Sequence, residues 1–131
     1  MPARPLLRVL CVEDDDDIRR ILRLSLEKIG RLTVELVADP RQAIESMIAF
    51  GPELVMLDWM MPEVDGPTLL LRMRGNPALR SLPVVFLTAK ASQRELAELR
   101  SLGAAGAISK PFAPKDLPGQ LQAIWRALPE N

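Results

Sequence analysis

Short apolar runs alternate along the chain with segments in which apolar residues recur every three or four positions. The pattern predicts five β-strands, at residues 7–13, 32–37, 53–58, 83–88 and 103–109, of which 32–37 alternates between apolar and polar residues and 103–109 consists of small residues. The segments after them predict five helices, because one face of an amphipathic helix carries its apolar side chains at that spacing. The expected buried stripes are Ile18, Ile21, Leu22, Leu26 and Ile29; Ile44, Met47 and Ile48; Leu69, Leu70 and Met73; Leu96, Leu99 and Leu102, in a more polar helix at 91–102; and Leu117, Leu121, Ile124, Trp125 and Leu128.

Five strand–helix pairs predict an α/β fold. Successive parallel strands need a crossover between them, and right-handed crossovers place helices on both faces of the sheet. We therefore expect a doubly wound, five-stranded parallel sheet of the flavodoxin-like (βα)5 kind, with strand order 2-1-3-4-5. No internal repeat, linker or low-complexity tract interrupts the pattern, so residues 1–131 are expected to form a single domain with residues 1–5 as an N-terminal tail.

Carboxylates end two of the predicted strands. Glu13 and Asp14 leave the first strand, and Asp58 ends the third. In the expected order these two strands are neighbours, and open sheets of this kind bind ligands at the carboxyl ends of their strands. The fourth and fifth strands end at Thr88 and Lys110. We therefore expect the three acids to cluster, with a hydroxyl and an ammonium group beside them.

Composition narrows the chemistry that this edge can perform. The chain has no histidine, which excludes imidazole bases and His-ligated zinc. Cys11, the only cysteine, falls in a predicted strand, and we expect it to be buried rather than reactive. Basic and acidic residues are equal in number, 17 of each, so charge does not favour nucleic acid or an anionic membrane as a partner.

The chain also lacks the sequence features of an exported or membrane protein. No apolar run is long enough to cross a bilayer, and the first residues lack the apolar core of a signal peptide. A single cysteine cannot form an internal disulfide, which suits a reducing compartment. We therefore expect the cytoplasm and no membrane association.

The expected acidic cluster favours a metal-dependent phosphoryl reaction. Neighbouring carboxylates raise one another's pKa unless a cation neutralises them. Because this cluster provides only oxygen ligands, Mg²⁺ is the cation that we expect. Carboxylates are nucleophiles toward phosphorus, and a phosphoryl group in transfer needs positive charge and hydrogen-bond donors around it. Asp58 could attack such a group, while Thr88 and Lys110 stabilise it.

Four motifs occur in order over nearly the whole chain. Together they resemble the receiver domain of bacterial two-component response regulators. One of them alone would be weak support, but the combination is highly specific. The motifs are Val12-Glu13-Asp14-Asp15, Leu57-Asp58-Trp59-Met60-Met61-Pro62-Glu63-Val64-Asp65-Gly66, Phe86-Leu87-Thr88-Ala89-Lys90 and Ser109-Lys110-Pro111-Phe112.

The resemblance implies how a phosphoryl group would be received. Asp58 would accept it from the phosphohistidine of a histidine kinase or phosphotransfer protein. Thr88 would be the switch hydroxyl that moves toward the phosphoryl group. Lys110 would pair with that group, aimed by a cis bond to Pro111.

The resemblance also implies a Mg²⁺ site. Asp14 and Asp58 would bind the metal directly, Glu13 through water, and Met60 through its backbone carbonyl. The pair Glu13 and Asp14 is favoured because both directly leave the strand, with Asp14 and Asp15 as the alternative pair. Asp15 and the two acids after it are then expected to cap the next helix and complement its dipole.

As a member of this family the protein would be a switch rather than an enzyme, although it would assist its own phosphotransfer and dephosphorylation. Its signal would pass to an unknown output protein through the surface formed by the fourth helix, the fifth strand and the fifth helix. The domain itself would be a monomer or a weak dimer. Ala107 stands where many receivers carry Tyr or Phe. We therefore expect the signal to travel mainly through the loop after Thr88 and the helix that follows.

Two other functions remain open from the sequence. A phosphatase of the haloacid dehalogenase type would also use an aspartate nucleophile, but it needs a second aspartate two residues later, where this chain has Met60. A docking module on the same fold would work without phosphorylation. The complete set of acids, threonine and lysine argues against that function.

Overall fold

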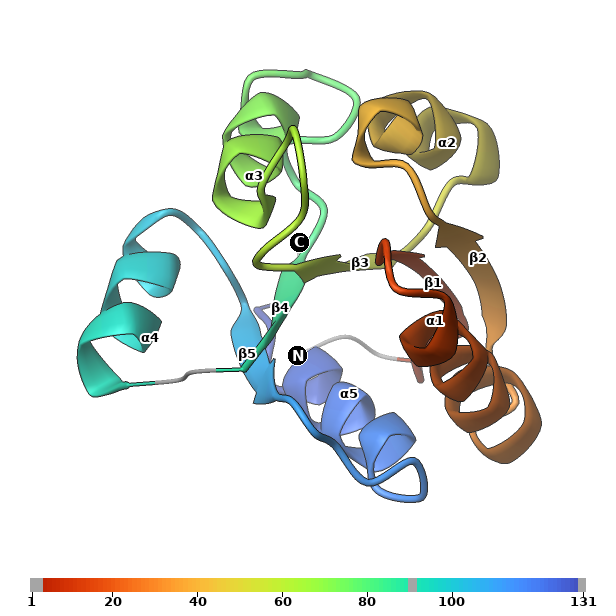
Figure 1. Cartoon of the computed structure of the whole chain (residues 1–131). Helices are drawn as coiled ribbons and strands as arrows, with labels where there is room; N and C mark the ends of the chain where they lie inside the picture. The colour runs from red at the N-terminus through yellow and green to blue at the C-terminus, as the bar shows by residue number, and fades with distance from the viewer. Residues whose placement is uncertain (1–3, 90–91, 130–131) are drawn as a thin grey trace.

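The computed structural model describes residues 4–89 and 92–129. Lys90 of the third motif, Ala91 at the start of the predicted helix 91–102 and residues 1–3 of the expected tail lie outside the described residues. The strands are β1 (Arg8–Val12), β2 (Thr33–Val37), β3 (Leu54–Asp58), β4 (Val84–Thr88) and β5 (Gly106–Ser109). The helices are α1 (Asp16–Arg23) with the π-helical turn η1 (Leu24–Ile29), the 3-10 turn η2 (Pro40–Gln42) with α2 (Ala43–Phe50), α3 (Gly66–Arg74), α4 (Gln93–Ser101) and α5 (Leu117–Arg126) (Figure 1).

The strands form one parallel sheet in the order β2-β1-β3-β4-β5, which confirms the predicted fold class and topology. The register brings the carboxyl ends of the strands level with one another. Val12 lies opposite Leu57, and Asp58 lies opposite Leu87. The residues that follow β1, β3, β4 and β5 therefore reach the same edge of the sheet.

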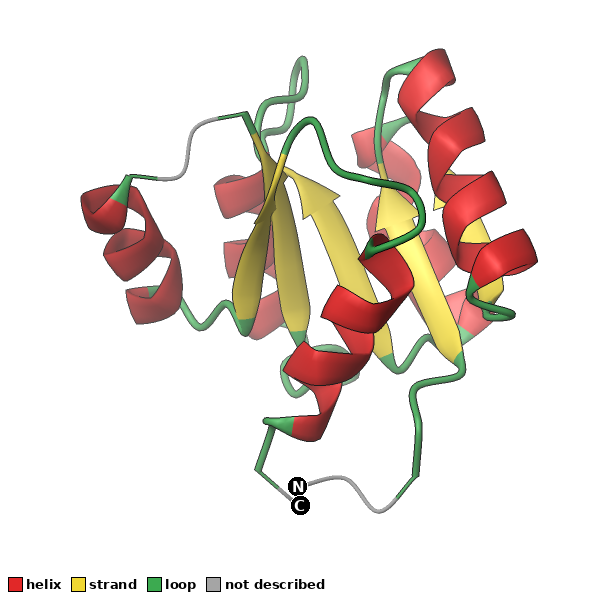
Figure 2. Ribbon diagram, turned by 90° about the horizontal axis from the view of Figure 1, so that it is seen from below, coloured by secondary structure: helices red, strands yellow, loops and turns green. Residues whose placement is uncertain are grey.

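Helices cover both faces of this sheet (Figures 1 and 2). Side chains alternate between the faces along a strand, so Leu10 and Val12 enter one core while Val9 and Cys11 enter the other. The helices α2, α3 and α4 cover the first face, and α1, η1 and α5 cover the second. The central strands β3 and β4 are buried along their whole length, so before their terminal Asp58 and Thr88 they are apolar throughout rather than alternating, whereas the edge strand β2 alternates and is partly exposed.

Three residues of the predicted helical stripes lie on the surface instead. Ile21, Ile29 and Ile48 are 39%, 44% and 57% exposed. A π-helical turn is wider than an α-helical one, so the 3.6-residue spacing does not continue through η1 to Ile29. Leu22 and Leu26 fill the core from this helix. The helix α2 packs against β1 and β2, and only Ala43 and Met47 of this helix are buried, so Ile48 falls outside the covered stripe.

The last strand begins later than the predicted 103–109. Gly103 turns with φ of 98°, and Ala104 and Ala105 still belong to the loop before β5. The composition of this segment gave no signal of the boundary, because its small residues suit a loop and a strand equally. The other four strands agree with their predicted ranges to within one residue at each end.

Two expectations from composition can be compared with this structure. Cys11 is buried, as predicted, and burial together with the charge of Glu13 raises the pKa of its thiol. Within the residues that the structure describes, none of the helices has the length and apolar character needed to cross a membrane.

Gly66 allows α3 to begin directly against the end of β3. Its N–H donates to the carbonyl of Trp59 at 2.9 Å, and Asp65 caps the helix by accepting from the N–H of Thr68. A Cβ atom on Gly66 would lie 2.6 Å from the carbonyl oxygen of Asp58 and 2.7 Å from Cε1 of Phe86. A larger residue here would therefore push on the strand end that carries Asp58.

Replacing Gly66 with alanine should destabilise the protein by about 1–3 kcal/mol, the usual effect of overfilling a packed site. Gly119 in α5 is the matched control, because a Cβ there meets nothing within 4 Å. Gly119→Ala should raise the free energy of unfolding by about 0.5–1 kcal/mol, since alanine favours the helix. Urea unfolding measures both changes, and equal effects of the two variants would contradict this account.

Candidate functional site

Three carboxylates meet at the carboxyl edge of the sheet. Glu13 and Asp14 come directly after β1, and Asp58 is the last residue of the neighbouring β3. One carboxylate oxygen from each residue lies within 4.8 Å of the other two. Glu13 is fully buried, Asp58 is buried and Asp14 is exposed, so the cluster opens to solvent on the Asp14 side.

Lys110 joins two of these acids from the far side of the sheet. It follows β5, and its Nζ lies 2.8 Å from Oε1 of Glu13 and 2.9 Å from Oδ1 of Asp58. Its bond to Pro111 is cis, as the resemblance implied. Lys110 therefore belongs to this cluster and is not a solvated surface charge.

The charges of the cluster perturb one another. Burial and, to a smaller extent, the nearby Asp58 raise the pKa of Glu13 to about 7, against the opposing effect of the hydrogen bond from Lys110. Burial opposes the charge on Lys110, but its bonds to Glu13 and Asp58 outweigh burial and hold its pKa above the ordinary value. One ammonium group can offset only one of the three carboxylate charges, so the site favours a further cation.

Thr88 and Met60 lie at the same edge. Thr88 ends β4, is 5% exposed and lies opposite Ser109, the residue before Lys110. Met60 is 80% exposed and lines an open hollow of about 590 Å³ together with the three carboxylates and Lys110. Trp59 is half-buried, and its ring centroid lies 6.2 Å from that of Phe86.

The acids that follow Asp14 have helix-related roles. Asp15 is the N-cap of α1, where its carboxylate accepts from the N–H of Ile18 at 2.9 Å. Asp16 and Asp17 lie in the first turn and pair with Arg19 and Arg20. This arrangement supports Glu13 and Asp14, rather than Asp14 and Asp15, as the acids of the cluster.

The sequence prediction missed one contact at the site. The guanidinium of Arg19 donates from Nη1 to the backbone carbonyl of Glu13 at 2.8 Å. The spacing of Arg19 from Asp16 indicates an ion pair on the helix surface, which is present. Nothing in that spacing indicates a bond back to the loop that carries Glu13.

The residues present fit a divalent metal that prefers oxygen ligands. Three carboxylates converge, no histidine is available in the chain, and the one cysteine is buried away from solvent. Mg²⁺ binds through carboxylates while keeping several waters, which suits a cluster that is open on one side. Asp58 is in contact with the ammonium group of Lys110, and a carboxylate in such a setting also suits the role of a nucleophile toward phosphorus.

Comparisons with known proteins agree with this chemistry. A family model described as the response regulator receiver domain matches residues 9–122. The phosphate regulon transcriptional regulatory protein PhoB of Escherichia coli strain K12 is 33% identical over 121 residues, which are 92% of this chain and 52% of PhoB. The chain thus spans about half the length of the curated relatives that it matches.

Solved structures resemble the fold over nearly its whole length. The chemotaxis protein CheY4 of Vibrio cholerae has a TM-score of 0.83 at 28% identity, covering 91% of this chain and 98% of CheY4. A putative response regulator from Chloroflexus aurantiacus has a TM-score of 0.81 at 29% identity, covering 94% and 99%. With the family model matching most of its length, this chain belongs to the receiver domains of two-component response regulators.

Proposed function

We propose that Asp58 is the residue on which this receiver domain accepts a phosphoryl group, in a reaction that depends on Mg²⁺. Receiver domains of this family are phospho-acceptor switches that work with histidine kinases or phosphotransfer proteins. The observation that carries the assignment is the convergence of Glu13, Asp14, Asp58 and Lys110 at one edge of the sheet. These groups supply a nucleophile, a metal site and a positive charge.

In the proposed reaction, a carboxylate oxygen of Asp58 forms a bond to phosphorus as the P–N bond of the partner's phosphohistidine breaks. Asp14 and Asp58 would bind the metal directly, Glu13 through water and Met60 through its carbonyl. When bound, Mg²⁺ supplies positive charge to the phosphoryl oxygens and offsets the repulsion among the acids. Because these groups favour both transfer and hydrolysis, the domain would assist its own phosphorylation and dephosphorylation.

Lys110 and Thr88 would act on the phosphoryl group once it is attached. The ammonium of Lys110 already touches Asp58, so it is placed to pair with a phosphoryl oxygen there. Thr88 ends the strand next to β3, and its hydroxyl would turn toward the same group. A change at Thr88 is the first step of the proposed signal.

The signal would leave through α4 rather than through an aromatic side chain on β5. Ala107 occupies the position that would carry such a ring, and a methyl group cannot swing between two packed arrangements. In α4 only Leu99 is buried, so this helix has few core contacts to hold it in place. We propose α4, β5 and α5 as the surface read by an output protein, with the domain monomeric or weakly dimeric in the cytoplasm.

The two alternative functions lose support at the site. The phosphatase would need a carboxylate at the position of Met60. Among the described residues, the acids that cluster with Asp58 are Glu13 and Asp14 alone, and both come from the end of β1. The phosphorylation-independent docking module gives no reason for Lys110 to bridge two buried acids.

Incubation with acetyl phosphate and Mg²⁺ should add a single phosphoryl group, detected by intact mass, and Asp58→Asn should abolish the adduct. Asp116→Asn is the control, because Asp116 begins α5 without a capping hydrogen bond and should be phosphorylated like the wild type. Turnover of a phosphomonoester would instead identify a phosphatase. No adduct, with or without metal, would favour the docking module.

Asp14→Asn should stabilise the metal-free protein, because it removes one of three clustered negative charges. Saturating Mg²⁺ should stabilise the wild type by RT ln(1 + [L]/Kd), about 2.7 kcal/mol at a hundredfold excess over Kd. Asp14→Asn should gain much less stability from Mg²⁺ than the wild type does. Urea unfolding with EDTA or Mg²⁺ measures both effects, and Asp17→Asn, which changes an exposed acid in the first turn of α1, should gain as much from Mg²⁺ as the wild type does. Equal Mg²⁺ stabilisation of Asp14→Asn and the wild type would exclude Asp14 as a ligand.

Beryllofluoride, a phosphoryl mimic, should change amide hydrogen exchange in α4, because the proposed signal passes from Thr88 to this helix. Thr88→Ala should bind the mimic but lose most of that change, whereas Thr88→Ser, which keeps the hydroxyl, should retain it. Hydrogen exchange with mass spectrometry resolves the helix. Unchanged exchange in α4 of the wild type would contradict this route.

A further inference from the structure

Asp14 depends on its backbone for its place in the acidic cluster. Its side chain is exposed, and among the described residues no group donates a hydrogen bond or forms an ion pair with its carboxylate. Glu13 and Asp58, in contrast, are buried and held by Lys110. Whatever fixes the chain between Glu13 and Asp15 therefore decides where the Asp14 carboxylate points.

The polar groups of Glu13 are all bonded. Its N–H donates to the carbonyl of Val37 at 3.0 Å, and its carboxylate accepts from Lys110 and from the N–H of Asp15 at 3.2 Å. Its carbonyl accepts from Nη1 of Arg19 at 2.8 Å. That carbonyl belongs to the planar peptide unit that also contains the nitrogen of Asp14. Holding the carbonyl therefore fixes the rotation of this unit, and with it the direction in which Asp14 leaves the chain.

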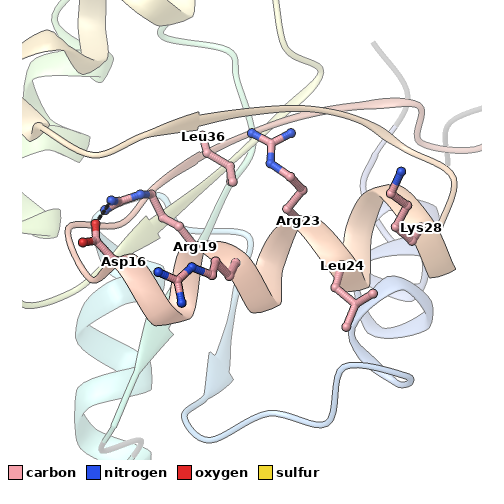
Figure 3. Close-up of a pocket in the computed structure, with 7 residues that line it drawn as sticks. Asp16, Arg19, Arg23, Leu24, Lys28 and Leu36 are labelled. Carbon is pink, nitrogen blue, oxygen red and sulfur yellow. Dashed lines mark hydrogen bonds and ion pairs between the residues drawn. The ribbon is translucent and has the colours of Figure 1, made fainter.

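Arg19 is itself held in the position that this bond requires. Its other terminal nitrogen pairs with Asp16, one turn earlier in α1, as Figure 3 shows. The side chain of Arg19 is 19% exposed, against 80% for Arg20, the next residue of the helix. Arg20 pairs with Asp17 in the same i,i+3 relation, but both side chains of that pair lie in solvent, and neither forms a hydrogen bond or ion pair with the described residues of the loop after β1.

We propose that Arg19 is a positioning residue for the metal site, which orients Asp14 by binding the carbonyl of Glu13. This inference rests on the proposed function, since it assumes that Asp14 binds Mg²⁺. Arg19 does not touch the metal or the phosphoryl group. It acts through the peptide between Glu13 and Asp14, in the way that outer hydrogen bonds orient the ligands of metal sites.

Charge and position must be separated to test this role. Removing Arg19 alone would leave Asp16 unpaired, and the added negative charge would by itself favour a cation. The double variant Arg19→Met/Asp16→Asn removes the bond to Glu13 without changing the net charge. The matched control is Arg20→Met/Asp17→Asn, which removes the exposed pair of the same helix and also leaves the net charge unchanged.

Mg²⁺ titration followed by the fluorescence of Trp59, the residue after Asp58, reports on the site directly. Trp125 provides a constant background, because its Nε1 donates to the carbonyl of Arg4 and it lies with the residues that precede the strands, at the opposite edge of the sheet. Arg19→Met/Asp16→Asn should weaken Mg²⁺ binding roughly tenfold, within the range found for outer partners of metal ligands. The control should remain within about twofold of the wild type. Thermal melting in EDTA shows that each variant is folded.

Similar Mg²⁺ affinities of the two double variants would overturn the role of Arg19. A wild type that binds Mg²⁺ in neither titration nor unfolding would instead overturn the proposed metal site itself, so the two failures can be told apart. If Arg19→Met/Asp16→Asn does not fold, Arg19→Gln/Asp16→Asn replaces it. Glutamine keeps a polar, helix-compatible side chain that ends two bonds short of Nη1, so the same tenfold loss is expected, and an unchanged affinity would count against the proposal.

Discussion

The contact of Lys110 with Glu13 and Asp58 holds together the functional edge of this protein. Its ammonium group extends from the end of β5 past β4 and reaches Asp58 at the end of β3 and Glu13 directly after β1. Two buried carboxylates side by side would be unfavourable without a cation, because burial and like charge both oppose their ionised forms. The ion pairs therefore allow the sheet to place two carboxylates, the proposed nucleophile Asp58 and the proposed metal ligand Glu13, in the same buried corner.

Lys110 neutralises only part of the negative charge in this corner, so the corner can still gain from binding a cation. Burial raises the pKa of Glu13 to about 7 although Lys110 touches it, and Asp14 lies exposed beside it. A site with a surplus of negative charge gains stability from a cation, and a phosphoryl group on Asp58 would then be held by that cation and by Lys110. The backbone beneath the acids is constrained from two sides, by Arg19 at Glu13 and by Gly66 against the carbonyl of Asp58.

In the proposed output surface, formed by α4, β5 and α5, the helix α4 and the strand β5 each bury only one residue. The strands β1, β3 and β4 are buried on both faces, whereas β5 is short, consists of small residues and lies at the edge of the sheet. With Ala107 in place of a ring, β5 has no bulky group that could move between two positions. The helix α4 depends on Leu99 for its buried contact, which is why we propose that a change at Thr88 would displace this helix.

Much of this was predictable from the sequence. The apolar runs predicted five strands, the helical spacings predicted five helices, and right-handed crossovers then restricted the order of the sheet, which the structure confirms. Asp58 and Glu13 could be placed at strand ends because the end of an apolar run is a local property. The same local signals failed for Ile21, Ile29 and Ile48, since the burial of a helix face depends on which element covers it.

The sequence by itself determined which side chains stand at the ends of the strands, because alternation and spacing act between near neighbours. Only the tertiary structure decided which of them touch. Lys110 and Glu13 are 97 residues apart, and their contact exists because the sheet brings the ends of β5 and β1 to one edge. The bond from Arg19 to the carbonyl of Glu13 depends on how α1 leaves its strand, and Gly66 is required because α3 starts against the end of β3. No spacing encodes such contacts, since they follow from the packing of whole elements.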